Sequence, residues 1–171
     1  MRESSGESGE HHEMGESARL LHELERSGEY VFHGSPDGGI AELEPRQGTM
    51  TVDDVEQEDG LPPGIATTPH ADLAIFRALT CNLYGHTGFG LRDDGTPFME
   101  ASKSVLDTVK GQTAHVYVLP KSQFAPATGD EKEMEWRSEA PQKPIQVVAV
   151  TDRDLPTNIK VIPGEIKERT P

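Results

Sequence analysis

Hydrophobic positions near the start of the chain recur at helical spacing. In "SARLLHELERSG", Leu20, Leu21 and Leu24 fall on one apolar stripe. Ser17 can cap this helix at its N-terminus, and Gly28 is a natural position for it to end. The pattern therefore predicts an amphipathic helix that buries one face against a hydrophobic core.

A second helical pattern follows a short apolar strand, "GIATT". Pro69 suits the first turn of the helix "PHADLAIFRALT", and Thr68 can cap it. One face of this helix consists of small or branched residues: Ala71, Ala74, Ile75 and Ala78. Because small residues permit close packing, we expect this face to lie on a sheet. A third helix is predicted in "EASKSVLDTVKG".

Several other segments have the alternation or the β-branched content that is typical of strands. They are Glu29 to Phe32, which is expected to turn at His33, and "TAHVYVLP", "MEWRS" and "IQVVAVT". The stretch "YGHTGFGLRDDGTPFM" predicts a hairpin with Asp94-Gly95 in its turn. Residues 46–63 are polar and acidic, which predicts a long loop, and the C-terminal residues after "IQVVAVT" show no clear pattern.

Strands and helices are mixed along the chain, and the spacing of the strands is irregular. This order favours an α+β fold with a mainly antiparallel or split sheet over a regular βαβ array. Residues 1–16 are rich in Ser, Gly, Glu and His and have no hydrophobic period, which predicts a disordered acidic tail. The remaining residues, 17–171, then form a single α+β domain.

The charge of the chain narrows the choice of partners. Its net charge is −14, from 30 acidic and 16 basic residues. A surface this acidic repels phosphate backbones, which argues against nucleic acid as a partner. No apolar run approaches about 20 residues, so no membrane span is expected, and the polar N-terminus predicts no signal peptide. The single cysteine, Cys81, excludes an intramolecular disulfide and fits a cytoplasmic location.

The common catalytic motifs are absent from the sequence, which contains no GxSxG, Walker A, HExxH or CxxC pattern. The glycines of "GHTGFG" lack the strand-to-helix context of a phosphate-binding loop, so we interpret them as a twisted hairpin. His11 and His12 are interpreted as solvated residues of the tail, and no metal site is expected.

Three segments taken together resemble a known family. The first is "YVFHGSP", the second is "GIATTPHADLAIFRAL", and the third is "TAHVYVLPKSQFAP" followed by "MEWRSEAPQKPIQVVAV". Their order resembles that of the ADP-ribosyltransferase superfamily, the NAD-binding fold of poly-ADP-ribose polymerases, ADP-ribosylating toxins and RNA 2'-phosphotransferases. The resemblance covers roughly residues 29–155. It implies a split, mainly antiparallel β-sheet with flanking helices.

The resemblance also implies which residues bind NAD. In the polymerase-like branch, a strand-end histidine bonds a ribose hydroxyl, and the following glycine offers its backbone to the nicotinamide amide. His33 and Gly34 match that pair, and Ser35 adds a hydroxyl beside them. Thr67 and Thr68 match the hydroxyl residues that the family places after its second strand. These five residues are the expected cofactor-binding residues.

The family's third element is a glutamate at a strand start, which stabilises the oxocarbenium-like transition state. Glu135 is the candidate, with Glu139 and Glu100 as alternatives. Strand alternation would place Met134, Trp136 and Ser138 on the core side and Glu133, Glu135 and Arg137 on the other. The tyrosine that stacks on nicotinamide has no counterpart, although Tyr84 or Phe76 could substitute for it.

The resemblance implies a domain that binds the dinucleotide NAD and either transfers ADP-ribose to an unknown acceptor, such as a protein, or hydrolyses NAD. One alternative is a non-catalytic interaction or regulatory domain that keeps the fold. A second is an RNA 2'-phosphotransferase-like enzyme, which needs basic residues to hold phosphate, whereas Arg46, Arg77 and Arg92 are scattered along the chain. The NAD hypothesis requires that His33, Thr67 and Glu135 line one pocket. Each of them also has a purely structural interpretation: a strand-end histidine, a helix cap and a solvated acid.

Overall fold

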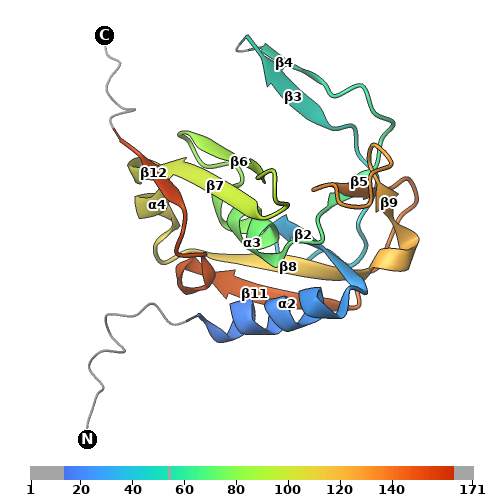
Figure 1. The fold of residues 1–171 in the computed structure, drawn as a ribbon, viewed down its shortest axis with the longest axis horizontal. Helices are drawn as coiled ribbons and strands as arrows, with labels where there is room; N and C mark the ends of the chain where they lie inside the picture. Colours follow the sequence, from blue (N-terminus) through green and yellow to red (C-terminus); the bar gives the residue numbers. More distant parts are fainter. Residues whose placement is uncertain (1–13, 54, 164–171) are drawn as a thin grey trace, which may run out of the picture.

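Antiparallel strand pairs make up most of the structure, a computed structural model that describes residues 14–53 and 55–163 (Figure 1). The helices are α2 (Glu16–Ser27), α3 (Ala71–Thr80) and α4 (Lys103–Val109), with two short 3₁₀ turns, η1 (Lys121–Gln123) and η2 (Asp152–Asp154). The strands are β2 (Tyr30–Ser35), β3 (Thr49–Val52), β4 (Val55–Glu58), β5 (Ile65–Thr67), β6 (Thr87–Leu91), β7 (Pro97–Ser102), β8 (Thr113–Pro120), β9 (Ala125–Pro126), β10 (Trp136–Ser138), β11 (Gln146–Thr151) and β12 (Lys160–Ile162).

The strands form three small sheets and a separate hairpin. The sheet orders are β11-β8-β2, β5-β10-β9 and β12-β7-β6, and β3 pairs with β4. Every named pair is antiparallel except β12 with β7, which is parallel. The predicted α+β fold with a mainly antiparallel sheet is therefore confirmed. No helix in the described part of the chain has the length and apolarity needed to cross a membrane.

The sheet of β2 and the sheet of β5 meet at a single point. Phe32 and Thr68 exchange two backbone hydrogen bonds, with N···O distances of 2.8 and 2.9 Å. Within the described residues, β2 and β5 share no other backbone pair, so the two sheets separate on the C-terminal side of Phe32. The result is a sheet that is split between β2 and β5.

Two hydrophobic clusters lie on opposite faces of the sheet β11-β8-β2. Because side chains alternate along a strand, Phe32 points to one face and Val31 to the other. The first cluster joins Phe32 and the same face of β8 and β11 to α2 and α3. The second cluster joins Val31 and the same face of β8, with Tyr117 and Leu119, to buried residues that lie outside this sheet: Leu43, Ile65, Phe124 and Trp136.

Helix α3 packs unusually close to β2, as its small-residue face predicted. Ala71, Ala74, Ile75 and Ala78 are all buried. A Cβ atom on Gly34 would lie 2.3 Å from the carbonyl oxygen of Ala74. Glycine is therefore needed at this position, because the backbone of the helix occupies the space of a side chain.

Several predictions about segment boundaries were wrong. The strand that was expected to turn at His33 continues as β2 to Ser35. The predicted loop at residues 46–63 contains the hairpin β3–β4, which projects from the body of the molecule (Figure 1). The C-terminal stretch contains β12, which pairs with β7. Most of the predicted tail, residues 1–13, lies outside the described residues, and α2 begins at Glu16.

The N-terminus of α2 is capped by a residue distant in sequence, not by Ser17. Gly15 occupies the N-cap position and makes no side-chain cap. Instead, the buried Asp154 accepts a hydrogen bond from the backbone N–H of Ala18 at 3.0 Å, and its second oxygen accepts one from Thr151 at 2.9 Å. One carboxylate therefore satisfies backbone donors of both α2 and η2. The predicted end of α2 at Gly28 is confirmed, since Gly28 has a left-handed φ of 74°.

Replacing Asp154 should weaken the whole domain. Asp154→Ala leaves two backbone donors without their acceptor, so the free energy of unfolding should fall by about 2–4 kcal/mol. Urea denaturation followed by circular dichroism measures this loss. Asp152→Ala is the matched control, because no hydrogen bond of the Asp152 side chain is found in the described chain. Equal stability of the two variants would contradict the role given to Asp154.

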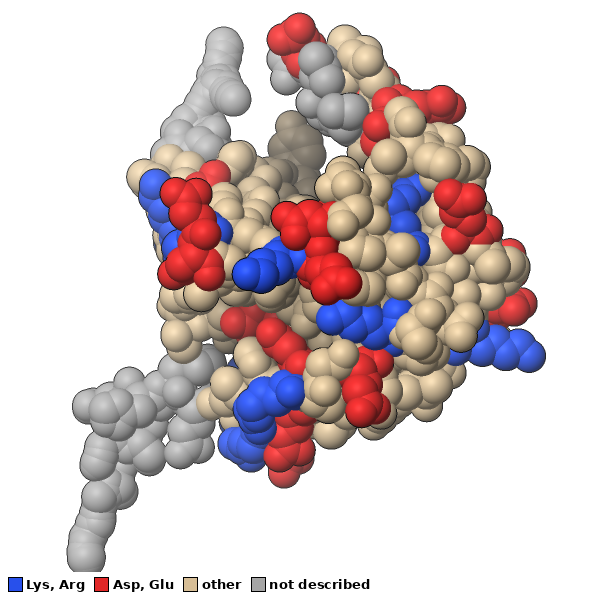
Figure 2. All heavy atoms as spheres, turned by 45° about the vertical axis from the view of Figure 1, so that its right-hand side comes forward, with Lys and Arg blue, Asp and Glu red and all other residues tan. Residues whose placement is uncertain are grey.

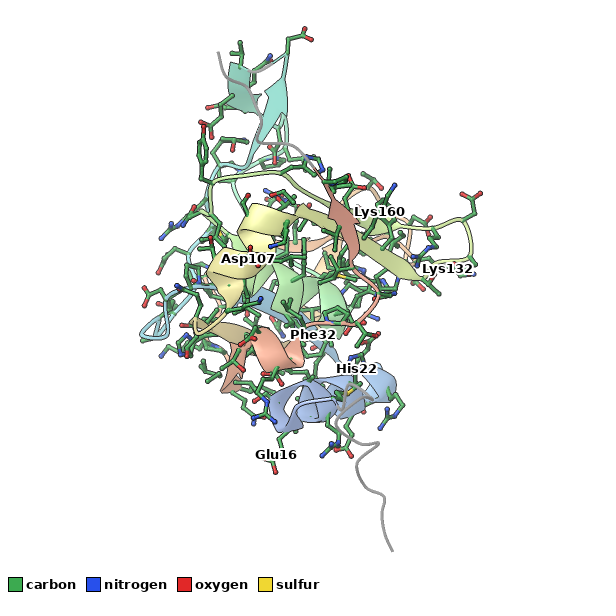
Figure 3. All side chains as sticks on the ribbon, turned by 90° about the vertical axis from the view of Figure 1, so that its left-hand side faces the viewer. Glu16, His22, Phe32, Asp107, Lys132 and Lys160 are labelled. Carbon is green, nitrogen blue, oxygen red and sulfur yellow. The ribbon has the colours of Figure 1, made fainter. Side chains whose placement is uncertain are left out.

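Helices α2 and α3 are joined by an ion pair between His22 and Asp72. The His22 Nε2 atom lies 2.7 Å from Asp72 Oδ1, and both side chains are partly buried. The hydrogen bond to Asp72 is the main cause of a raised pKa of His22, which burial partly opposes. Figure 3 shows His22 on α2 and Phe32 in the interior of the fold.

This ion pair should make stability depend on pH in a defined direction. Because the pKa of His22 is raised on folding, the pair contributes fully below pH 6.5, and its contribution is lost as pH rises through the folded pKa. Asp72→Asn should therefore lower the free energy of unfolding by about 0.5–1 kcal/mol more at pH 5.5 than at pH 8.5. Urea denaturation of both proteins at the two pH values measures the difference. Asp93→Asn, at an exposed position, should show no such dependence, and a pH-independent cost for Asp72→Asn would refute the pair.

Candidate functional site

A pocket opens where the sheets of β2 and β5 separate, and we call it the central pocket. Its empty space is about 480 Å³, part of it open to solvent. Its polar lining consists of Gly34, His33, Thr67, Thr68, Arg77 and Glu135. Its apolar lining includes Phe32, Leu73, Ala74, Phe89 and Met134. The structure thus brings His33, Thr67 and Glu135 to one pocket, as predicted, although 102 residues separate the first from the last.

The side chain of His33 is bonded to β5, the strand on the opposite side of the split. Its Nδ1 atom is 2.9 Å from the carbonyl oxygen of Ala66. A carbonyl can only accept, so Nδ1 carries the proton and Nε2 is left as an acceptor. Burial lowers the pKa of His33, and Arg77 and Arg46 lower it further, against the opposing effect of the bond to Ala66. The ring is therefore neutral at pH 7.

Gly34 presents unpaired backbone groups to the central pocket. Phe32 directs its N–H and C=O away from β8, because both are bonded to Thr68. Residues two apart in a strand direct these groups to the same side, so the N–H and C=O of Gly34 also point away from β8. No turn or loop in the described chain supplies a partner for them. Its missing side chain faces α3, so Gly34 offers the pocket its backbone.

Thr67 and Thr68 line the central pocket but also have structural partners. The buried hydroxyl of Thr67 donates to the carbonyl of Trp136 at 2.8 Å, which joins β5 to β10. The hydroxyl of Thr68 accepts from the N–H of His70 at 3.1 Å. His70 is the N-cap of α3, so the prediction that Thr68 caps this helix was wrong by two residues. Each hydroxyl keeps a lone pair with which it can accept from a ligand.

Glu135 reaches the central pocket just before β10 begins. Its Oε2 atom is 2.8 Å from Nη1 of Arg137, which also lies 3.8 Å from Asp59. The alternation predicted for this segment holds for Trp136 and Ser138, which are buried, but not for Met134, which lines the pocket together with Glu135. The reason is that regular strand geometry starts only at Trp136.

The two alternative glutamates do not line the central pocket. Glu139 is exposed. Glu100 lies on β7, where its carboxylate is 2.8 Å from the Nε2 atom of His86. Among the three candidates, the structure therefore places only Glu135 beside His33.

A second pocket, the outer pocket, lies on the other side of the split. Its empty space is about 770 Å³, and it shares His33 and Ala66 with the central pocket. Ser35 lines this second pocket and not the central one, and its hydroxyl accepts from the N–H of Asp37 at 3.0 Å. The charged residues of its lining are Arg46 and Arg137, which are basic, and Glu42 and Glu44, which are acidic.

The sequence did not lead us to assign Arg77 and Phe89 to the central pocket. The guanidinium of Arg77, on α3, lies 4.8 Å from the ring centre of Phe89, on β6. The proposed substitutes for a stacking tyrosine do not line the pocket, because Tyr84 is fully exposed and Phe76 is fully buried. The signal for Arg77 was its place one helical turn after Ala74, on the edge of the buried face.

Comparisons with known proteins returned nothing that assigns a family. No protein-family model matches the chain. Searches of curated proteins and of solved structures likewise gave no match. Among the described residues, no group of three or more His, Cys, Asp or Glu side chains is arranged to hold a metal ion. The function is therefore inferred from the two pockets and the residues that line them.

Gly34 should be intolerant of any side chain because of α3. In Gly34→Ala, the added Cβ would meet the backbone of Ala74 at 2.3 Å and of Ala78 at 2.8 Å, so the helix must shift. The free energy of unfolding should fall by about 1–3 kcal/mol in denaturant titrations. In Gly39→Ala, the nearest atom would be Asp37 Oδ1 at 3.7 Å, and stability should not change. An unaltered midpoint for Gly34→Ala would show that α3 does not pack as described.

Proposed function

We propose that this chain is an NAD-binding domain of the ADP-ribosyltransferase type, which transfers ADP-ribose to an acceptor or hydrolyses NAD. The observation that carries the proposal is the convergence of His33, Gly34 and Glu135 on the central pocket. These residues come from separate segments whose order along the chain resembles that of the superfamily. A cytoplasmic location fits the proposal, because the sequence has one cysteine and can form no intramolecular disulfide.

The nicotinamide ring fits the central pocket by its chemistry. A carboxamide has an N–H₂ donor and a C=O acceptor, which match the unpaired C=O and N–H of Gly34. The ring itself would lie against apolar side chains such as Phe89 and Met134. The free Nε2 of the neutral His33 can accept a hydrogen bond from a ribose hydroxyl.

Glu135 has the charge that the proposed reaction needs. When the bond between nicotinamide and ribose breaks, positive charge develops on the ribose, and a fixed carboxylate nearby stabilises it. The hydrogen bond to Arg137 at 2.8 Å holds the carboxylate in place and compensates part of its negative charge. Water or a side chain of an acceptor protein would then attack the ribose carbon.

The outer pocket can accommodate the rest of the dinucleotide. It adjoins the central pocket at His33 and Ala66, so a ligand that occupies both would pass through the split. Arg46 and Arg137 line the outer pocket together with two acidic residues, Glu42 and Glu44, and guanidinium groups bind phosphate oxygens well. The diphosphate of NAD is the part of the ligand that these residues suit.

A non-catalytic interaction or regulatory domain is the main alternative, and two contacts favour it. The Glu135 carboxylate is already paired with Arg137, and the Thr67 hydroxyl already donates to Trp136. An RNA 2'-phosphotransferase-like enzyme is the other alternative, and it is favoured by the approach of Arg46 and Arg77 to the pockets. Turnover of NAD in the absence of RNA separates the first proposal from both alternatives.

Binding and turnover should respond differently to two substitutions. NAD should bind the unmodified protein in calorimetric titrations, and His33→Ala should weaken binding by roughly 1–3 kcal/mol, because the ribose hydroxyl loses its partner. Glu135→Gln keeps the shape of the side chain, so affinity should change little while NAD turnover falls steeply. Nicotinamide release, followed by chromatography, measures turnover.

Glu139→Gln is the matched control for Glu135→Gln, since it removes the same charge from an exposed position outside both pockets. It should leave binding and turnover unchanged. Absence of heat and of a thermal shift at millimolar NAD would overturn the NAD proposal. Binding without turnover in the unmodified protein would favour the non-catalytic alternative.

A further inference from the structure

The central pocket has a wall made of a cation stacked on an aromatic ring. The guanidinium carbon of Arg77 lies 4.8 Å from the centre of the Phe89 ring, and both residues line the pocket. Such stacking restrains the guanidinium plane and leaves its N–H donors free at its edge. Arg77 and Phe89 come from α3 and β6, so the wall exists only in the folded chain.

Among the described residues, Arg77 has no ion-pair partner, although an acidic residue lines the same pocket. Glu135 is the other fully charged residue of the lining, and its carboxylate is 2.8 Å from Arg137, on the far side of the split. No ion pair or side-chain hydrogen bond of Arg77 is found in residues 14–53 and 55–163. On the face shown in Figure 2, basic and acidic side chains are interspersed. Arg77 is an exposed residue, so solvent can reach its guanidinium, and its position in the pocket wall makes these donors available to an anionic ligand.

We propose that the central pocket binds a planar ring next to an anionic group and that Arg77 is the residue that binds the anion. Apolar side chains of the pocket contact the ring, while the edge of the Arg77 guanidinium donates to carboxylate or phosphate oxygens. The inference rests on the proposed function only for the identity of the ring. The pyridinium ring of NAD carries a positive charge, which the charge of Arg77 repels. Arg77 therefore favours a ligand in which a phosphate group lies close to the guanidinium.

Four small probes test the ligand class on the intact chain. Nicotinamide is an uncharged ring, nicotinate adds a ring carboxylate, and nicotinamide mononucleotide adds a phosphate. Adenosine monophosphate keeps the phosphate and changes the ring. Dissociation constants come from chemical-shift titrations of ¹⁵N-labelled protein, which also show whether each probe binds at the central pocket. NAD is titrated in parallel.

Three variants isolate the contribution of Arg77. We expect at least one anionic probe to bind the unmodified protein about tenfold or more tightly than nicotinamide, and Arg77→Gln to remove that advantage. Arg77→Lys keeps the charge but lacks the planar guanidinium, so it should retain part of the tighter binding of the anionic probe. Arg153→Gln removes the same charge from an exposed residue that lines neither pocket, and it should bind as the unmodified protein does. Thermal denaturation checks that each variant is folded.

The pattern of binding identifies the anion and separates this inference from the proposed function. Selective binding of nicotinate assigns Arg77 to a ring carboxylate, and selective binding of either mononucleotide assigns it to a phosphate. Arg77-dependent binding of adenosine monophosphate, with no binding of NAD, supports the inference and overturns the NAD proposal. Equal NAD affinity in Arg77→Gln and the unmodified protein overturns the inference alone. No binding of any probe or of NAD overturns both.

Discussion

The pair of backbone hydrogen bonds between Phe32 and Thr68 joins the two sheets on which the site depends. Strands β2 and β5 are held together at this one point and then separate, so backbone groups that a continuous sheet would pair are left open. Gly34 lies two residues after Phe32 on one side of the split, and Ala66 lies on the other. The site is therefore a consequence of how the sheet is interrupted, and His33 bridges the interruption through its bond to Ala66.

Close packing of α3 against β2 holds the strand in place, although in the described chain its edge toward β5 is unpaired beyond Phe32. Helix α3 lies so near Gly34 that no side chain fits between them, and this contact fixes the strand while its outward backbone groups stay unpaired. The same helix carries Arg77 to the pocket. Glu135 is paired with Arg137, whereas Arg77 lines the same pocket and has no ion-pair partner among the described residues. The central pocket thus keeps an unpaired positive charge within an acidic protein.

The parts of the fold that could be predicted from sequence are those with a strong local pattern. The alternation of β8 and β11 and the glycine that ends α2 belong to this class. The hairpin β3–β4 was missed because β4 is exposed at every position, so it has no hydrophobic alternation. His33 and Glu135 could be placed in one pocket from the order of their segments, whereas the stacking of Arg77 on Phe89 could not be predicted. Their contact depends on how α3 and β6 meet, which no local pattern records.

The central claim is that a ligand ring lies against the backbone of Gly34 inside the split. The most direct measurement is the ¹H–¹⁵N spectrum of the labelled protein with and without NAD. The amide signals of Gly34, Thr68 and Phe89 should move together with one dissociation constant, while those of α2 stay in place. Saturating NAD that leaves the Gly34 signal unmoved, or that shifts only signals remote from the central pocket, would contradict the account.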